Sequence, residues 1–364
     1  MTNLYQAKVE VSDQSERAQS RAVKDALGRV LVKVSGSDLI LQHDQIKQQL
    51  KNSQSFLTSY RFDNDKGIQF LLAEFDKQRV ESAILASGFS IWGARRPDSL
   101  LWIALEDIES GERRILSEAQ QDPFSEMAKR TAQSRGIPLA FPLYDLTDID
   151  ALSVFDVWGQ FVTSIQRASE RYRADYILSA RVYFRDDEAN ASEKREVPLN
   201  SAVEAQQDTP QWLLDYEDPQ SDSLTGWIAD YSLISGGNVT QQSISASTKE
   251  NLASMLMTIL ADTLAKRYAI DLAAGREEGN VVDITMANVS NLQTYVAVSQ
   301  FLQSLSVVQQ VSLKQQSGTQ AIYSLTLFGN VDDLKNAFKL DDKIRPTRDA
   351  FGQVSDELKF IWVP

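Results

Sequence analysis

Four aspartates lie close together in the segment FPLYDLTDIDALSVFDVWG, which spans residues 141–159. They are Asp145, Asp148, Asp150 and Asp156. Carboxylate oxygens are the ligands that Ca²⁺ and Mg²⁺ prefer, and two facing carboxyl groups can also hydrolyse a bond as acid and base. Asp145 and Asp148 follow an apolar run that predicts a strand, and ligands of parallel α/β sheets bind beyond the carboxyl ends of strands. This segment is therefore the first candidate for a ligand site.

Helix capping is a second explanation of the same aspartates, and it is the one that we favour. An aspartate at the start of a helix accepts hydrogen bonds from free N–H groups and opposes the helix dipole, which accounts for Asp148 and Asp150. The D-x-x-D-x-D spacing also lacks the glycine and the terminal glutamate of a calcium-binding loop. We therefore predict capping rather than metal binding at this segment.

The rest of the chain offers few groups for catalysis. It contains no cysteine, which excludes disulfides, thiolate nucleophiles and zinc–sulfur sites. His43 is the single histidine, its neighbourhood is polar and no nucleophile-elbow motif occurs, so we predict a surface position. No phosphate-binding loop of the form GxxxxGKS/T or GxGxxG follows a strand. We predict no catalytic residue, no metal centre and no cofactor.

Tryptophans indicate a different kind of site, because an exposed aromatic face can bind a sugar or a peptide. Trp158 lies at helical spacing with four other apolar residues, which predicts a position in the core. Those residues are Phe155, Phe161, Val162 and Ile165. Trp212 and Trp227 lie in predicted strands and could share a partly exposed sheet face. The candidate ligand-binding residues are Asp145, Asp148, Trp212 and Trp227.

Three arginines follow one another closely in the stretch SIQRASERYRADY. Arg167, Arg171 and Arg173 could clamp a carboxylate through bidentate hydrogen bonds. They also lie near the end of a predicted helix, where cations complement the helix dipole. We favour this second explanation, which assigns the arginines no ligand.

Composition narrows the class of protein. The chain has 364 residues, 43% of them hydrophobic and 24% charged, as expected for a folded protein of two or three domains. Its net charge of −13 repels phosphate backbones, so nucleic-acid binding is disfavoured. No apolar run approaches the roughly 20 residues of a membrane span, so no transmembrane segment is predicted. Because cysteine is absent and a strand pattern begins almost at once, we expect an exported, periplasmic protein in which Met1 replaces a removed signal peptide.

Hydrophobic periodicity and turn signals predict an α/β protein of three small α+β domains. Residues 1–94 form a β-α-α-β-β-α module. The elements expected in it are a strand at 4–11, a helix from residue 12 to Gly36, a helix at 44–50, a hairpin at 59–75 and a helix at 78–87. Residues 276–364 follow the order β-α-β-β-α-β, which is typical of a ferredoxin-like domain.

The middle domain, residues 95–275, alternates strands with helices, which favours a mixed, partly parallel sheet. Its expected elements are strands at 99–108, 137–143, 174–184, 211–218, 226–234 and 238–247, and helices at 124–134, 151–172 and 249–268. Residues 185–210 are polar and have no period, so we expect a long loop that is mobile or functional.

Three blocks of the sequence resemble a known family. They are LYQAKVEVSDQSERAQSRAVKDALGRVLVKVSGS, GIPLAFPLYDLTDIDALSVFDVWG and ASERYRADYILSARV. They are similar to a proteobacterial periplasmic envelope family known as domain of unknown function number two thousand and sixty-six. This resemblance implies export and carries no catalytic residue. A more distant likeness to flagellar-ring-associated, envelope-lipoprotein and translocation-factor domains implies binding to protein partners.

Three hypotheses for the function follow from these observations. The first is a non-enzymatic periplasmic interaction or scaffold protein that docks envelope partners through sheet edges and the loop 185–210. The second is a glycan- or peptide-binding module that uses the end of strand 137–143 and the face around Trp212 and Trp227. The third is a hydrolase that uses two of the four aspartates. The sequence leaves the partner and the oligomeric state open.

Overall fold

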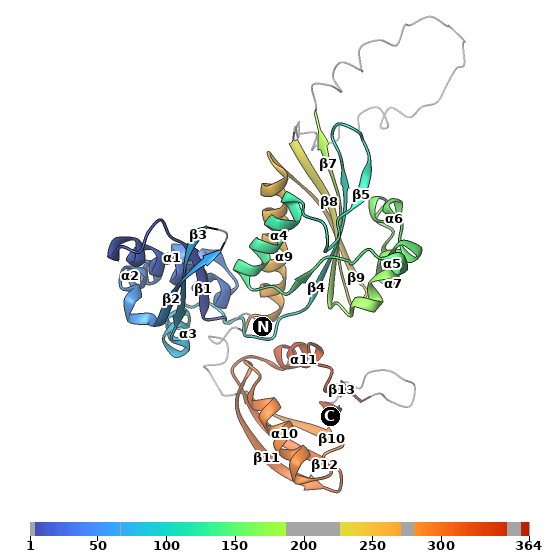
Figure 1. Ribbon diagram of the computed structural model, residues 1–364. Helices are drawn as coiled ribbons and strands as arrows, with labels where there is room; N and C mark the ends of the chain where they lie inside the picture. Colours follow the sequence, from blue (N-terminus) through green and yellow to red (C-terminus); the bar gives the residue numbers. More distant parts are fainter. Residues whose placement is uncertain (1–3, 66, 187–225, 271–279, 348–357, 364) are drawn as a thin grey trace, which may run out of the picture. The chain divides into compact units, whose positions relative to one another are not determined.

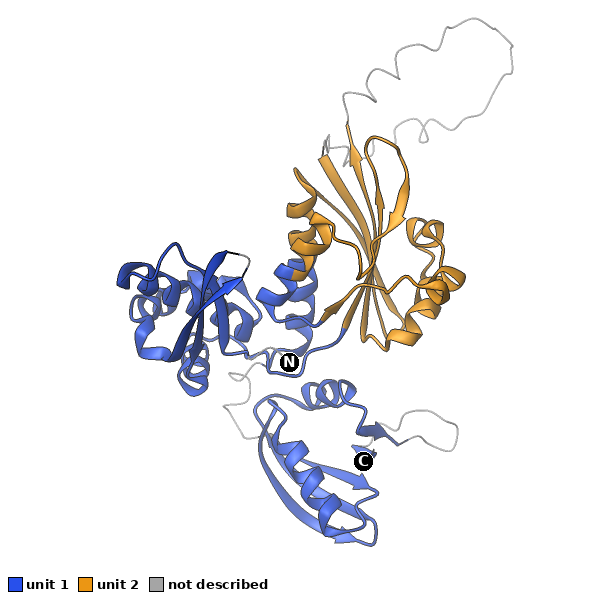
Figure 2. Ribbon diagram, viewed as in Figure 1, with its two compact units in different colours: residues 1–98, 130–138, 257–364 blue, residues 99–129, 139–256 orange. Residues whose placement is uncertain are grey.

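The computed structural model of the protein describes most of the chain, and Figure 1 shows its elements. The residues described are 4–65, 67–186, 226–270, 280–347 and 358–363. The chain divides into two compact units (Figure 2). The first comprises residues 1–98, 130–138 and 257–364, and the second comprises residues 99–129 and 139–256. Among the helices described, none combines the length and the apolar character that a membrane-spanning segment requires.

The N-terminal part of the first unit is a three-stranded sheet, ordered β1-β3-β2, with helices packed against it. Its elements are β1 (Gln6–Glu10), α1 (Glu16–Ser35), α2 (Asp44–Lys51), β2 (Leu57–Asp65), β3 (Ile68–Phe75) and α3 (Lys77–Ala86), with 3-10 turns at Asp38–Gln42 and Ser53–Phe56. Helix α1 begins after Ser15, whose side chain accepts a hydrogen bond from the Ala18 N–H. It ends at Gly36, which adopts a left-handed φ of 76°. The predicted β-α-α-β-β-α order is confirmed.

The C-terminal part of the first unit is a five-stranded sheet, ordered β11-β12-β10-β14-β13. Its elements are β10 (Asn280–Ala287), α10 (Leu292–Gln303), β11 (Val308–Ser317), β12 (Gln320–Leu327), α11 (Val331–Lys339), β13 (Ile344–Pro346) and β14 (Lys359–Trp362). The predicted ferredoxin-like order is confirmed, with one addition. Strand β13 precedes the last strand, and β14 consequently runs parallel to β10 rather than antiparallel. Three residues are too few for alternation to reveal such a strand in the sequence.

The second unit is built on a mixed sheet, ordered β5-β4-β7-β8-β9, in which β6 also pairs with β4. Its strands are β4 (Ser99–Glu106), β5 (Arg113–Ile115), β6 (Leu139–Ala140), β7 (Tyr176–Arg185), β8 (Gly226–Ser235) and β9 (Asn238–Ala246). Strand β4 runs parallel to β6 and β7, and the remaining pairs are antiparallel, which confirms the predicted partly parallel sheet. Two long helices, α4 (Pro123–Arg135) and α9 (Lys249–Tyr268), contribute residues to both units.

One face of this sheet is covered by short helices rather than by the single helix predicted at 151–172 (Figure 1). The helices are α5 (Leu146–Ala151), α6 (Val154–Trp158) and α7 (Val162–Ser169), followed by the 3-10 turn η3 (Glu170–Tyr172). Ser153 forms a capping box that starts the new helix α6. Gln160, between α6 and α7, has a left-handed φ of 53°, which separates these two helices. The prediction of one continuous helix was wrong because local capping overrides the apolar period. The strand predicted at residues 137–143 is shorter in the structure, where it is β6 (Leu139–Ala140).

Some predictions fall on residues that the structure does not describe. They include residues 187–210 of the predicted loop, the strand at 211–218 and Trp212. The three sheets lie within the three predicted domains, 1–94, 95–275 and 276–364. The boundaries of those domains stay a prediction.

Candidate functional site

Asp145 forms an internal ion pair. It is the N-cap of α5 and accepts a hydrogen bond from the Asp148 N–H at 3.1 Å. The Arg171 guanidinium donates to both of its carboxylate oxygens, at 2.7 and 2.9 Å. These hydrogen bonds, that from Arg171 first, lower the pKa of Asp145 to about 2, so this carboxyl is ionised near neutral pH. The bidentate clamp that the sequence allowed for Arg171 therefore exists, and its carboxylate belongs to the same chain.

Asp148 is fully buried, and every donor around it comes from the second unit itself. Its carboxylate accepts hydrogen bonds from the Tyr144 N–H at 2.8 Å, from Arg171 at 2.9 Å and from the Tyr172 hydroxyl. The same hydroxyl accepts from the Leu143 N–H at 2.9 Å. Burial, and then the hydrogen bond to Asp148, raise the pKa of Tyr172 to about 12, which keeps this hydroxyl a donor. Asp148 thus joins the start of α5 to the end of η3.

The other two aspartates of the segment behave differently from each other. Asp156 completes the capping box of α6, because it accepts from the Ser153 N–H at 2.8 Å while the Ser153 hydroxyl accepts from the Asp156 N–H at 3.2 Å. Asp150 is exposed and lies in the last turn of α5, so the predicted capping role is wrong for this residue. Within the described part of the chain, no three histidine or acidic side chains converge in a way that could hold a metal ion.

Trp227 lies on β8, and only 8% of it is exposed. Its ring meets Phe184 edge to face, with 5.7 Å between the ring centroids, and the Lys249 ammonium lies 5.1 Å from its centroid. Tyr231, four residues further along β8, is also buried, and its hydroxyl donates a hydrogen bond to the Gln242 side chain at 2.6 Å. Both aromatic residues therefore contribute mainly to packing, which leaves little ring surface for a glycan.

The segment that holds the four aspartates also exposes five large apolar side chains, which we call the 143–161 surface. They are Leu143, Leu146, Ile149, Phe155 and Phe161. Leu146 is 79% exposed and Phe155 is 67% exposed. Trp158, for which a core position was predicted, is half-buried and packs against the core of the second unit. Its neighbours Phe155 and Phe161 are exposed, because the helix that would have placed them on one face is broken at Ser153 and Gln160. Exposed apolar groups of this size, gathered in one segment, are typical of interaction sites.

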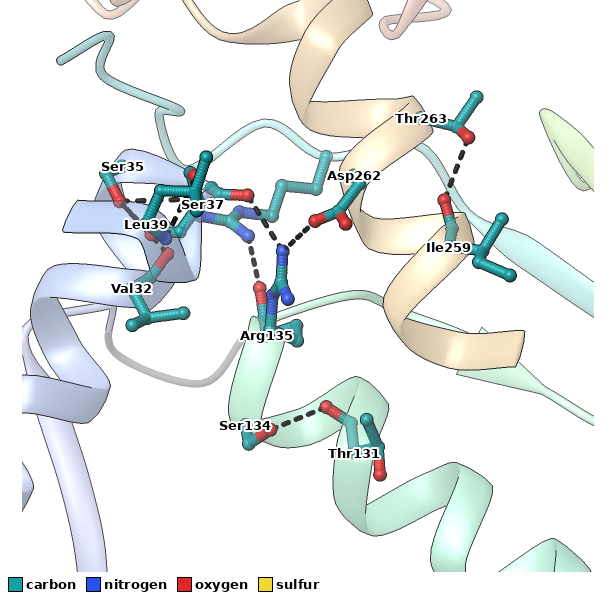
Figure 3. Close-up of polar contacts among 12 residues, drawn as sticks. Val32, Ser35, Ser37, Leu39, Thr131, Ser134, Arg135, Ile259, Asp262 and Thr263 are labelled. Atoms are coloured by element: carbon teal, nitrogen blue, oxygen red, sulfur yellow. Dashed lines mark hydrogen bonds and ion pairs between the residues drawn. The ribbon is translucent and has the colours of Figure 1, made fainter. Parts of the chain in front are cut away.

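A second polar cluster lies in the first unit, around buried cations (Figure 3). Arg135, at the end of α4, donates to the Gly36 carbonyl at 2.8 Å and to the Asp262 carboxylate on α9. Arg96 donates to the carbonyls of Lys33 at 2.5 Å and Arg135 at 2.6 Å. This cluster joins the end of α1 to α4 and α9 through carbonyl oxygens and the Asp262 carboxylate, which satisfy most of its donors, although the buried Arg135 Nε has no hydrogen-bond partner among the described residues.

Lys33 makes this cluster sensitive to pH. Burial first, and then the nearby Arg96 charge, lower the pKa of Lys33 to about 8 from an ordinary 10.5. The folded state therefore loses this proton before the unfolded state does, and this one group should contribute a rise of about 2 kcal/mol in the free energy of unfolding between pH 8 and 10. We expect Lys33→Met to abolish this rise, measured by urea denaturation at both pH values. Lys24→Met, at an exposed position of α1, should keep it; equal slopes for both variants would contradict the assignment.

A small hollow in the first unit is lined by Arg95, Arg267 and Asp333, among others. Its volume of about 30 Å³ admits water and is far below the roughly 300 Å³ of a small-molecule site. The four aspartates lie outside it. Most of the candidate residues brought together by the fold thus form ion pairs and caps, and the aspartate segment also presents several large apolar side chains to solvent.

Comparison with known proteins adds a family assignment for one part of the chain. Residues 1–93, which contain the N-terminal sheet, match the model of a domain of unknown function, DUF8605. No curated protein matches the chain in sequence. A solved structure, selenomethionine-substituted allophanate hydrolase from Kluyveromyces lactis, aligns with 8% identity over 81% of this chain and 62% of that chain. Its TM-score is 0.18, which carries no argument about fold or activity, and the chain spans less than two thirds of that protein's length.

The fold and these findings define a class. The chain is a multi-domain α+β protein whose N-terminal part matches an uncharacterised domain.

Proposed function

We propose that the chain is a non-enzymatic protein-interaction or scaffold protein of the bacterial cell envelope that acts in the periplasm. The main support for the proposal is the environment of the side chains in residues 141–161. Asp145, Asp148 and Asp156 are engaged in internal hydrogen bonds, while residues 143–161 present the 143–161 surface to solvent. The free energy falls when a partner covers exposed apolar side chains and removes them from water. Such a surface therefore favours a role in protein binding over a role in catalysis.

We prefer binding to hydrolysis because of the state of the two best candidate acids. Asp145 is ionised and paired with Arg171, and Asp148 is buried among three donors. A general acid needs a proton that it can release to a substrate within hydrogen-bonding reach. The glycan-binding alternative has weaker support, because Trp227 is packed against Phe184.

The envelope setting rests on sequence features. The resemblance of three sequence blocks to the periplasmic family known as domain of unknown function number two thousand and sixty-six supports it. The complete absence of cysteine is compatible with an exported protein. The match of residues 1–93 to a domain of unknown function does not bear on the compartment.

The proposal predicts that polar substitutions on the 143–161 surface abolish partner capture without unfolding the protein. We expect Leu146→Ser combined with Phe155→Ser to lower the yield of crosslinked partners from an envelope extract by about tenfold, which corresponds to about 1.4 kcal/mol of binding free energy. Because both side chains are exposed, the melting temperature should stay nearly unchanged.

A matched control uses apolar residues that are equally exposed elsewhere. Leu39→Ser combined with Leu292→Ser removes two such side chains from the first unit, and it should leave partner capture intact. Undiminished capture by the Leu146/Phe155 variant would show that the 143–161 surface is not the binding site.

A further inference from the structure

Each sheet of the protein ends in strands whose outer N–H and C=O groups could recruit another strand. Proteins usually prevent this with short edge strands, charged side chains, proline or β-bulges. The described sheets have seven edge strands: β1, β2, β5, β6, β9, β11 and β13. Strand β6, which pairs only with β4, spans two residues. Strands β5 and β13 span only three residues each, and β13 ends in Pro346. Strand β1 carries Lys8 and Glu10, and β2 and β11 carry both register shifts and charged residues.

Strand β9 has none of these protective features. It is nine residues long, and it pairs with β8 in an unbroken register from Asn238 to Ala246. Its sequence NVTQQSISA contains no proline and no charged residue, and residues 238–243 are exposed. The uncharged stretch extends from Tyr231 to Thr248, although 24% of the whole chain is charged.

The register identifies the groups at the open edge. Ser235 and Asn238 flank the two-residue turn Gly236–Gly237, so they form a hydrogen-bonded pair next to the turn. Because such pairs alternate along an antiparallel ladder, the N–H and C=O groups of four residues point away from β8. These residues are Val239, Gln241, Ser243 and Ser245. No strand in the described ranges pairs with this side of β9.

We propose that a second copy of this chain pairs its own β9 with this edge in antiparallel orientation, so that two sheets join across a two-fold axis. Lack of charge argues for a second copy. An isologous interface brings the same strand of both copies together, so a charge on that strand would lie near its counterpart in the other copy and repel it. Although the chain has a net charge of −13, β9 itself is uncharged, so the β9 strands of two copies can pair without electrostatic repulsion. Full overlap of the four outward-facing residues allows about eight hydrogen bonds between the copies.

Sedimentation velocity on the full chain tests this interface. We expect a dimer for the unmodified protein, with Ser243→Pro and Ser243→Lys each weakening dimerisation by about tenfold or more. Proline removes an outward N–H that the β8–β9 ladder does not use, and lysine places like charges near each other across the axis. Ser243→Thr keeps the N–H and should stay dimeric. An equal mixture of Ser243→Lys and Ser243→Glu should restore dimers.

Because the chain contains no cysteine, an introduced cysteine can be spin-labelled at one position, and the distance between the labels of two copies can be measured directly. Ser243→Cys introduces a single thiol for a spin label, and two such labels should lie within about 20 Å, because paired strands are about 4.8 Å apart. A label at Glu109→Cys, in the turn that joins β4 to β5, should give distances of about 40 Å, since three to four strand spacings separate it from β9 in each copy. A monomeric wild type, a dimer that tolerates both Ser243→Pro and Ser243→Lys, or a long distance between labels at 243 would each overturn the proposal.

Discussion

Asp148→Ala is expected to lower the free energy of unfolding by about 3 kcal/mol or more. The substitution leaves the half-buried Tyr172 hydroxyl and the Tyr144 N–H without their acceptor, and it removes one of the two carboxylates that Arg171 contacts. Thermal or urea denaturation of the purified protein at neutral pH measures the loss. The size of the effect follows from burial, because a donor left unsatisfied in the interior keeps its desolvation penalty.

A control distinguishes this structural role from a catalytic or metal-binding one. Asp150→Ala removes a carboxylate two residues away that is exposed, and it should change the free energy of unfolding by less than about 0.5 kcal/mol. A carboxylate kept for chemistry often strains its fold, so its removal tends to leave stability unchanged or to raise it. A wild-type melting temperature for Asp148→Ala would therefore contradict our account of the segment.

Gly36→Ala is expected to destabilise the first unit by about 3 kcal/mol, the combined effect of a left-handed backbone and a steric clash. Gly36 has a φ of 76°, and a Cβ placed there would lie 2.5 Å from the Cβ of Ala265 on α9. The close approach of α1 to α9 thus requires glycine at this position. Denaturation by urea is again the appropriate measurement.

Two further variants separate the clash from the backbone strain. Gly88 has a similar φ of 75° with nothing within 4 Å of an added Cβ, so Gly88→Ala should lose only about 1–2 kcal/mol. Ala265→Gly should recover part of the loss in the Gly36→Ala background, because it removes the atom that clashes. Equal losses for Gly36→Ala and Gly88→Ala, with no coupling to Ala265, would show that α1 and α9 do not meet as described.

Most of the fold could be predicted from the sequence, because its signals are local and strong. Ser15 and Gly36 mark the ends of α1, and Gly236–Gly237 marks the β8–β9 turn. The uninterrupted apolar run of β4 indicates a strand buried on both faces, and β4 does lie inside the sheet. Each of these features depends on residues within one element.

The features that escaped prediction depend on partners that are distant in sequence or on competition between local signals. Arg171 contacts Asp145 across 26 residues, which no spacing in the sequence indicates. Phe155 and Phe161 fit a helical period with Ile165, but the Ser153 capping box and the turn at Gln160 divide that helix. Gly159, next to Gln160, is the signal that could have located the second break.

The most direct test of the account places a photo-reactive phenylalanine analogue at position 155 of the full-length protein in living cells. We expect it to crosslink a discrete envelope protein, and we expect the crosslink to disappear when Leu146→Ser is added. The same analogue at exposed Leu292 should not capture that protein. The account would be contradicted if position 155 captured no protein, or if it captured the same protein as position 292 and was insensitive to Leu146→Ser.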